Sequence, residues 1–443
     1  MRVPFLLLAT VLWGALAAPA SAFTLLTLDK EATFYSDPSR ASGIAEIRVG
    51  RDRALAERRD PRCPATSRIR ISSYYQNRFV GNPEMELPCE RWSKGAEGYV
   101  YRDPTGAAAG IRTIRYGRDG LTIRAASPGH IPVVGPVGFV HVRFSVGETR
   151  YFVRFHNFSR NDPRAVVSPR PSRAAALGEA AFWDTLLGDA HRASESLRLL
   201  RQASAANPRD GRSLFLAGMM HLYRYEIVVP DPRFVSTAGK REILASTVAF
   251  DRAVPLLWDG VVGDSRAGGF AAAATYKKGI AFGDPNEVAR GIDAMNRATD
   301  DNPLFNGFIP FGAGPIAAPD SPAYATILHL LDDVFPTVFG ECGSNAEICF
   351  NDGLAPHNLE GTLLLFGDLY AKAGRVEDAE TSYSTAAAAG ENSGWSPAFI
   401  ARARTLAATA AERAALYNDE DPRNDPPFTD LGGVGNCAYC HNR

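Results

Sequence analysis

Hydrophobic and polar residues alternate along the first third of the chain. In Arg68-Ile69-Arg70-Ile71, charged and apolar side chains follow one another with period two, the pattern of a strand with one solvated face. Residues 111–116 and 121–124 show a similar alternation on either side of a glycine-bounded turn, which predicts a hairpin. Residues 139–144 and 151–155 predict a second hairpin. Short strands at this spacing favour a β-sandwich or small barrel.

The period changes after a short proline-rich stretch. Residues 164–172 carry prolines without periodicity, which predicts a linker. It separates a β-sandwich-like domain over residues 23–163 from residues 173–411, where apolar residues recur at three and four positions. That spacing is typical of amphipathic helices. We therefore expect a multidomain α+β chain, with the β-sandwich-like domain followed by an all-α domain of helical hairpins.

One helical segment carries the pattern of a repeat. Gly367 and Ala379 are small residues placed where two antiparallel helices would approach, and Tyr370 and Tyr383 are placed to fill the space between them. This spacing resembles a tetratricopeptide repeat. The resemblance implies stacked helices that offer a surface to protein partners. Weaker echoes over residues 185–208 and 272–303 do not keep a regular period, so we expect a degenerate array.

The balance of positive and negative charge limits the classes of function. The chain has 48 Lys and Arg against 49 Asp and Glu, a net charge of -1. It therefore lacks the overall basic field of nucleic-acid-binding proteins, and we expect no nucleic-acid partner.

The N-terminus predicts export. Residues 1–22 combine a basic start, an apolar run and small residues that end at Ala22, as in a signal peptide cleaved near that position. No later stretch approaches the roughly 20 apolar residues that a membrane span needs. We expect a periplasmic or secreted protein without a membrane span.

The end of the chain carries the most specific motif. Cys437-Ala438-Tyr439-Cys440-His441 places two thiols three positions apart, with a histidine directly after the second. It resembles the haem-attachment motif of c-type cytochromes. The resemblance implies one covalent haem c, bonded through Cys437 and Cys440, with His441 as the proximal iron ligand. A structural zinc site would need a second ligand pair, which the sequence lacks, and the remaining alternative is a short disulfide. Residues 412–443 are expected to form a solvated tether that carries this motif.

The other four cysteines suit an oxidising compartment. Their order along the chain suggests the pairs Cys63–Cys89 and Cys342–Cys349, one in each half of the protein. Each disulfide would staple its own region.

The sixth position of the iron needs a separate ligand if the haem transfers electrons. His357 follows a proline at the expected start of a repeat helix, just beyond the Cys342–Cys349 loop, and is the first candidate. Its alternative role is that of a helix-start residue beside the capping residue Asn358. His329 lies in an apolar run, where we expect a core or groove histidine, and is the second candidate.

Two histidines of the β region are not expected to be ligands. His141 shares its strand face with Arg143, and His156 lies beside Arg154. The alternation predicts that these side chains face solvent, because the neighbouring valines and phenylalanines occupy the opposite face.

The sequence favours an exported mono-haem protein that transfers electrons or senses redox state, docking to a redox partner protein through its helical repeats. The alternative is a haem-free periplasmic scaffold or adaptor for protein–protein interactions. No hydrolase, P-loop or dinucleotide-binding motif is complete, and no catalytic residue is assigned. Peroxidase-like activity would require an open sixth position on the iron.

Overall fold

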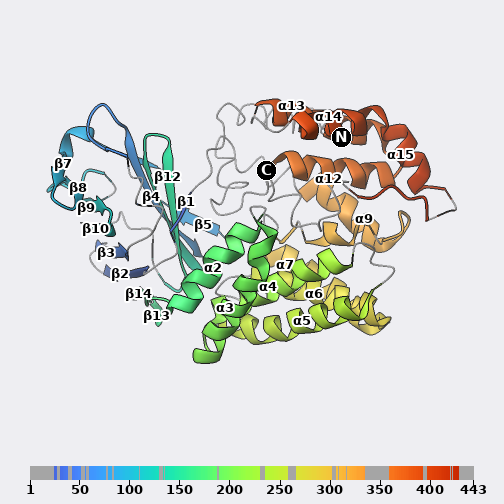
Figure 1. Ribbon diagram of the computed structural model, residues 1–443, viewed down its shortest axis with the longest axis horizontal. Coiled ribbons are helices and arrows are strands. Elements are labelled where there is room, and N and C mark those ends of the chain that lie inside the picture. Colours follow the sequence, from blue (N-terminus) through green and yellow to red (C-terminus); the bar gives the residue numbers. More distant parts are fainter. Residues whose placement is uncertain are drawn as a thin grey trace.

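A computed structural model gives the arrangement of the chain (Figure 1). It describes residues 24–26, 30–37, 42–50, 55, 59–75, 78–81, 84–108, 110–128, 133, 135–186, 189–229, 235–257, 266–301, 306–307, 309–315, 317–334, 359–392, 397–419, 421 and 423–428.

The N-terminal half is built from two β-sheets. Its strands are β1 (Thr24–Leu25), β2 (Glu31–Asp37), β3 (Ser42–Val49), β4 (Ser67–Tyr75), β5 (Arg78–Gly81), β6 (Met85–Leu87), β7 (Trp92–Gly95), β8 (Gly98–Arg102), β9 (Ile111–Gly117), β10 (Gly120–Pro128), β11 (Phe139–Val146), β12 (Thr149–Phe155), β13 (Arg160–Asp162) and β14 (Ala165–Ser168). One sheet has the order β1-β12-β11-β4-β5, with β6 also paired to β4. The other has the order β13-β14-β2-β3-β10-β9-β8-β7. Strand β14 lies within the stretch expected to be a linker.

Both predicted hairpins are present. Strands β9 and β10 pair antiparallel, as do β11 and β12. Between the sheets lies an apolar core that includes Val142, Phe144 and Tyr151, and the hydroxyls of Tyr116 and Tyr151 are hydrogen bonded at 2.7 Å. The predicted sandwich-like domain is therefore confirmed.

The C-terminal half is helical. Its helices are α2 (Arg173–Leu186), η3 (Ala190–Arg192), α3 (Ala193–Ala206), α4 (Gly211–Val228), α5 (Thr237–Leu257), α6 (Arg266–Phe282), α7 (Pro285–Asp301), η4 (Pro310–Ala313), α9 (Pro322–His329), η5 (Leu330–Val334), α12 (Leu359–Lys372), α13 (Val376–Asn392), α14 (Pro397–Ala408) and α15 (Ala410–Tyr417). A further short helix, η2 (Cys89–Arg91), belongs to the β region. The chain thus has the expected α+β layout.

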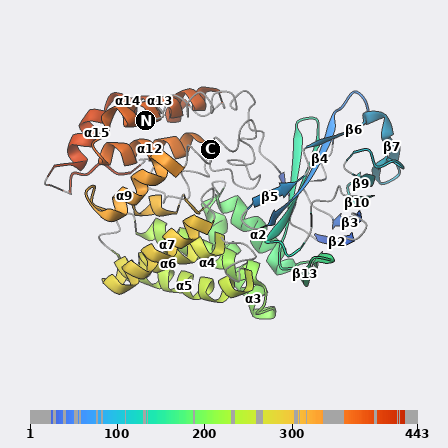
Figure 2. The same cartoon turned by 180° about the vertical axis from the view of Figure 1, so that it is seen from behind.

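Consecutive helices pack as hairpins, notably α2 with α3, α4 with α5, α6 with α7 and α12 with α13. In the last pair, a Cβ atom added to Gly367 would lie 2.4 Å from the ring of Tyr383, so the small residue sets the approach of the two helices. The helical half has two apolar cores, one within α2–α6 and one centred on α12–α15. Figures 1 and 2 both show α2 where the helical half meets the sheet that contains β12.

The outer face of that sheet is covered. Val140, Val142 and Phe144 face the sandwich core, whereas Phe139 and His141 face the helices. The prediction of solvated histidines is therefore wrong: His141 is 1% exposed and His156 is 6% exposed. Arg143 and Arg154 are buried with them. Period two distinguishes the two faces of a strand, but the polar face here lies against a second domain.

Candidate functional site

The predicted haem-attachment motif, residues 437–441, lies outside the described residues. So do four further residues of interest from the sequence, His357, Asn358, Cys342 and Cys349. The structure does describe the segment that leads to the motif as far as Phe428, and it describes the second candidate ligand, His329.

The segment before the motif is held against the helical half. Arg413 donates a hydrogen bond from Nη2 to the carbonyl of Pro427 at 3.0 Å. The ring of Phe428 packs edge-on against Tyr417, with centroids 5.5 Å apart, and the Lys372 ammonium lies 5.7 Å from the same ring. Residues 424–428 are therefore anchored, and the helix α15 already occupies the start of the stretch expected to be a solvated tether.

A buried ion pair positions this anchor. Arg413 Nη2 lies 2.5 Å from Asp368 Oδ1, and the Tyr383 hydroxyl donates to the same oxygen at 2.5 Å. Burial raises the pKa of Tyr383, and the neighbouring Asp368 carboxylate raises it further. The hydroxyl therefore stays protonated and can donate. Because Asp368 is on α12, Tyr383 on α13 and Arg413 on α15, one carboxylate ties three helices together.

His329 is exposed, so its predicted place in a core or groove is wrong. Its side chain is 63% exposed at the end of α9, where the helix changes into the short π-helical turn η5. Its Nδ1 is hydrogen bonded to Asp333 Oδ2 at 2.8 Å, which leaves Nε2 as the nitrogen that can bind a further group. A carboxylate on one ring nitrogen is the arrangement that orients metal-binding histidines.

His329 and the anchored tail lie at the same end of α12. Tyr324, five residues before His329 in α9, donates from its hydroxyl to the carbonyl of Leu369 at 2.7 Å. The Lys372 ammonium lies 5.9 Å from the ring of Tyr324 as well as 5.7 Å from that of Phe428.

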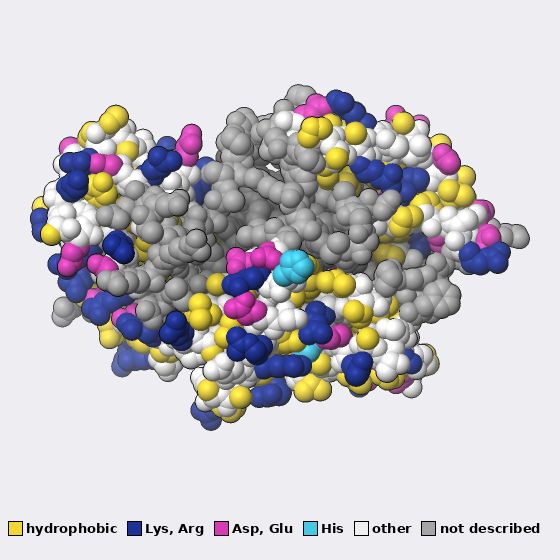
Figure 3. Space-filling model, viewed as in Figure 1, with side chains coloured by type: hydrophobic (Ala, Val, Ile, Leu, Met, Phe, Trp, Pro, Cys, Tyr) yellow, Lys and Arg dark blue, Asp and Glu magenta, His cyan; other side chains and the backbone are white. Residues whose placement is uncertain are grey.

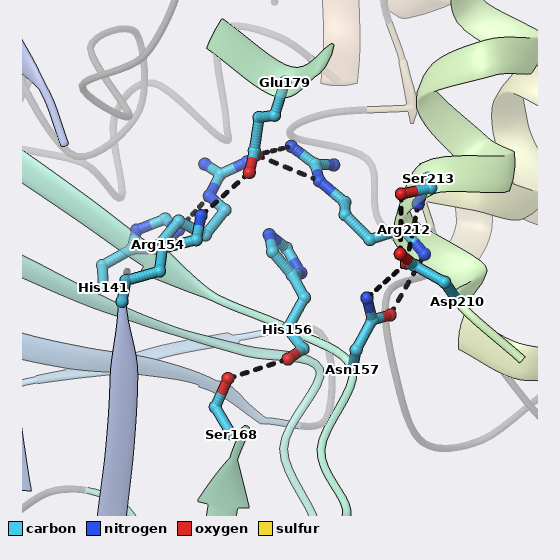
Figure 4. A network of polar contacts seen from close by, with 10 residues as sticks. His141, Arg154, His156, Asn157, Ser168, Glu179, Asp210, Arg212 and Ser213 are labelled. Atoms are coloured by element: carbon cyan, nitrogen blue, oxygen red, sulfur yellow. Dashed lines mark hydrogen bonds and ion pairs between the residues drawn. The ribbon is translucent and has the colours of Figure 1, made fainter. Parts of the chain in front are cut away.

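The most charged buried region joins the two halves of the chain. We call it the interdomain cluster; it comprises Lys30, His141, Arg154, His156, Glu179, Arg212 and Arg266. Glu179 Oε2 accepts from Lys30 Nζ at 2.8 Å, and Oε1 accepts from Arg212 Nη2 at 3.0 Å (Figure 4). Burial alone would raise the pKa of Glu179, but Lys30 and Arg212 outweigh it and hold that pKa below its usual value.

Residues of β11 and β12 form the part of the cluster that lies on the sheet. Arg154 donates from Nε to His141 Nε2 at 2.6 Å, and this nitrogen of His141 must therefore be an acceptor. The Phe139 ring stacks on His141 and lies 4.3 Å from the guanidinium of Arg266, which is on α6. Phe139 and His141 are two positions apart and therefore lie on the same face of β11. A phenylalanine on that face is the sequence feature that indicates that the face is covered.

His156 lies at the centre of the cluster, and its ring points into the space between Arg154 and Arg212 (Figure 4). Neither ring nitrogen has a hydrogen-bond partner in the part of the chain that the structure describes. Burial lowers the pKa of His156 well below its usual value, and Arg212, Arg154, Arg266 and Lys30 lower it further. The ring is therefore neutral at physiological pH.

The cluster continues into a helix cap. Asn157 donates from Nδ2 to Asp210 Oδ1 at 2.6 Å, and its Oδ1 accepts from the backbone N–H of Arg212 at 3.0 Å. Asp210 caps α4 by accepting from the backbone N–H of Ser213 at 2.9 Å. A β-region residue thus completes the N-terminus of a helix in the other half, which makes the cluster a fixed joint between the two halves.

The expected Cys63–Cys89 disulfide is present, with Cα atoms 4.9 Å apart. These sulfurs and Glu90 are the one group within the described ranges whose atoms lie close enough to hold a metal ion. Because both sulfurs are joined in the disulfide, neither is available as a thiolate ligand.

Comparison with known proteins leaves the family open. No protein-family model matches the chain, and no curated protein or solved structure shows significant similarity. Among the described helices, none has the length and apolar character that crossing a bilayer requires.

Proposed function

We propose that this chain is an exported mono-haem c-type cytochrome-like protein that transfers electrons or senses redox state. The observation that carries the proposal is the sequence Cys437-Ala438-Tyr439-Cys440-His441. Its two thiols have the spacing needed to bond a porphyrin, and His441 follows directly as an iron ligand. When bound, the haem would supply a one-electron couple.

The described structure supports a haem held against the helical half. Phe428 packs on the helical half, and the nine residues from there to Cys437 can span at most about 32 Å. His329 is at the same end of α12, exposed, with its Nδ1 held by Asp333. It therefore has the geometry of a sixth ligand supplied by the helical half, and His357 remains the alternative.

The position of the motif favours work with a partner protein. The motif directly follows a Gly-rich stretch that includes Gly432, Gly433 and Gly435, so the residues before it are not expected to form a helix that packs on the haem. A haem held beside the helical hairpins would lie next to a surface that a redox partner could contact. We propose that the helical hairpins form this docking surface and that the protein acts in the periplasm or outside the cell.

Expression in a host that assembles c-type cytochromes tests the proposal. The purified protein is expected to keep its haem absorbance on the polypeptide after acid–acetone extraction, and Cys437→Ser with Cys440→Ser should abolish it. Cys342→Ser with Cys349→Ser is the matched control and should retain the bound haem. Haem that is extracted, or absent, would leave the scaffold or adaptor function.

The same preparation identifies the sixth ligand. If His329 binds the iron, His329→Ala converts the visible spectrum from the low-spin to the high-spin form and His357→Ala does not. The reverse result assigns His357. A high-spin spectrum in the unsubstituted protein would indicate an open position and favour peroxidase-like chemistry.

A further inference from the structure

A cavity of about 430 Å³ lies between α3, α4 and α5, separate from the interdomain cluster and from the segment that leads to the haem motif. Its polar walls are Arg201 from α3, His221 and Arg224 from α4, and Arg241 and Glu242 from α5. We call this cavity the arginine pocket. Its volume falls within the range of small-molecule sites.

One carboxylate organises the pocket. Glu242 Oε1 lies 2.8 Å from Arg224 Nη2, and Glu242 Oε2 lies 2.6 Å from His221 Nδ1. Arg201 Nη2 lies 2.9 Å from His221 Nε2. A guanidinium can only donate, so Nε2 accepts and Nδ1 carries the proton that is donated to Glu242. Glu242 therefore holds Arg224 directly and Arg201 through a neutral imidazole.

Positive charge is in excess in the pocket. Three guanidinium groups face one carboxylate, and burial lowers the pKa of His221, which keeps that ring neutral. The Arg241 side chain makes no hydrogen bond or ion pair with any residue that the structure describes. Figure 3 shows Lys and Arg side chains gathered over the surface formed by α3, α4 and α5.

The rest of the arginine pocket is lined by apolar side chains. Val228, Ala238 and Ala245 line the same cavity, and each is small enough to leave room for a carbon chain. Guanidinium groups bind the oxygens of carboxylates and phosphates with paired hydrogen bonds, which an ammonium group cannot match in geometry.

We propose that the arginine pocket binds a small organic anion through its carboxylate or phosphate group. Arg201 and Arg241 supply positive charge that no carboxylate among the described residues neutralises, and Arg224 supplies a third donor. The short carbon chain of the ligand lies against the apolar wall. This site is independent of the haem and of the function proposed above.

Calorimetric titration of the purified full-length chain tests the site, with succinate as the carboxylate probe and inorganic phosphate as the second probe. Chloride keeps the ionic strength constant, so that general screening does not vary. At least one probe is expected to bind saturably with one site per chain. Binding of succinate alone indicates an organic acid, and binding of phosphate alone indicates a phosphate ester.

Arg241→Gln is the decisive variant because Arg241 is exposed and has no partner to lose within the described residues. It should weaken binding at least tenfold. Arg252→Gln removes the same charge from an exposed position three turns further along α5 and should change the affinity less than twofold. The proposal is overturned if neither probe binds at millimolar concentration, or if both variants weaken binding equally.

Discussion

Glu179 of α2 accepts a hydrogen bond from Lys30, 149 residues earlier, with 2.8 Å between Oε2 and Nζ. Each side chain is 7% exposed. This pair, together with Arg212, joins the β region to the helical half through charges that water cannot screen. Removing one of these charged groups should strongly destabilise the folded protein, because the remaining charges stay buried without a partner.

The first prediction concerns this ion pair. Glu179→Gln keeps the shape of the side chain but leaves Lys30 and Arg212 without their shared carboxylate. It should lower the free energy of unfolding by roughly 3–5 kcal/mol. Urea denaturation followed by circular dichroism measures the change.

Glu31→Gln is the matched control, because Glu31 lies next to Lys30 in sequence but its side chain is 33% exposed and its ion pair with Arg48 is at the surface. It should cost at most about 1 kcal/mol. Equal losses in the two variants would show that the interdomain pair has no special role.

The second prediction concerns pH. Because the pKa of His156 is lower in the folded chain than in the unfolded one, the unfolded chain binds the proton more readily. The contribution of His156 to the free energy of unfolding is therefore constant above about pH 6.5. It falls as the pH drops below that value, by up to about 1.4 kcal/mol per pH unit. His156→Phe should reduce the slope of unfolding free energy between pH 6.5 and 5.

His221 contributes a slope of the same sign, since burial lowers its pKa as well, so the difference between His156→Phe and the unsubstituted protein is the quantity to measure. Parallel pH profiles for the two proteins would contradict the assignment. At pH 8 the phenylalanine should be neutral or stabilising, because it removes two buried nitrogens without partners among the described residues.

The third prediction concerns the α12–α13 hairpin. Alanine normally stabilises a helix relative to glycine by about 1 kcal/mol. At Gly367 the sign should reverse, because the added methyl group would meet the ring of Tyr383. We expect Gly367→Ala to destabilise by about 1–3 kcal/mol. Ser384→Ala, at an exposed position of α13, should be neutral or slightly stabilising, and a stabilising Gly367→Ala would refute the close approach.

The fourth prediction concerns the anchored tail. Phe428→Ala removes the ring that packs on Tyr417 and should cost about 1–2 kcal/mol of local packing. The open population of residues 418–428 should then rise roughly 5- to 30-fold, and limited proteolysis of this segment should accelerate by a similar factor. Arg423→Ala is the control, since that side chain is 87% exposed and pairs only with Asp421 among the described residues. Equal cleavage rates in both variants would rule out the anchor.

Alternation and helical spacing were sufficient to predict the two-part fold, the β9–β10 and β11–β12 hairpins and the contact of Gly367 with Tyr383. They could not predict that the polar face of β11 and β12 is buried, because the residues that cover this face, such as Arg266 over the Phe139 ring, come from distant segments of the chain. His329 was expected in a core because Leu330 and Leu331 follow it; the turn into η5 instead leaves the histidine exposed.

The two candidate sites differ in how far sequence could show them. The proposed haem-attachment motif is contiguous, so the spacing of its cysteines and histidine is enough to propose its chemistry. The arginine pocket draws Arg201, Arg224 and Arg241 from three helices, and each of them alone is typical of an ordinary solvated helix face. Only the packing of α3, α4 and α5 brings the three guanidinium groups to one cavity.

The most direct test of the account is the intact mass of the exported protein, measured before and after acid–acetone extraction. We predict a chain that begins near Phe23 and is heavier than its polypeptide by one haem, with the same mass after extraction. A mass equal to that of the polypeptide alone, from a host that assembles c-type cytochromes, would contradict the central claim.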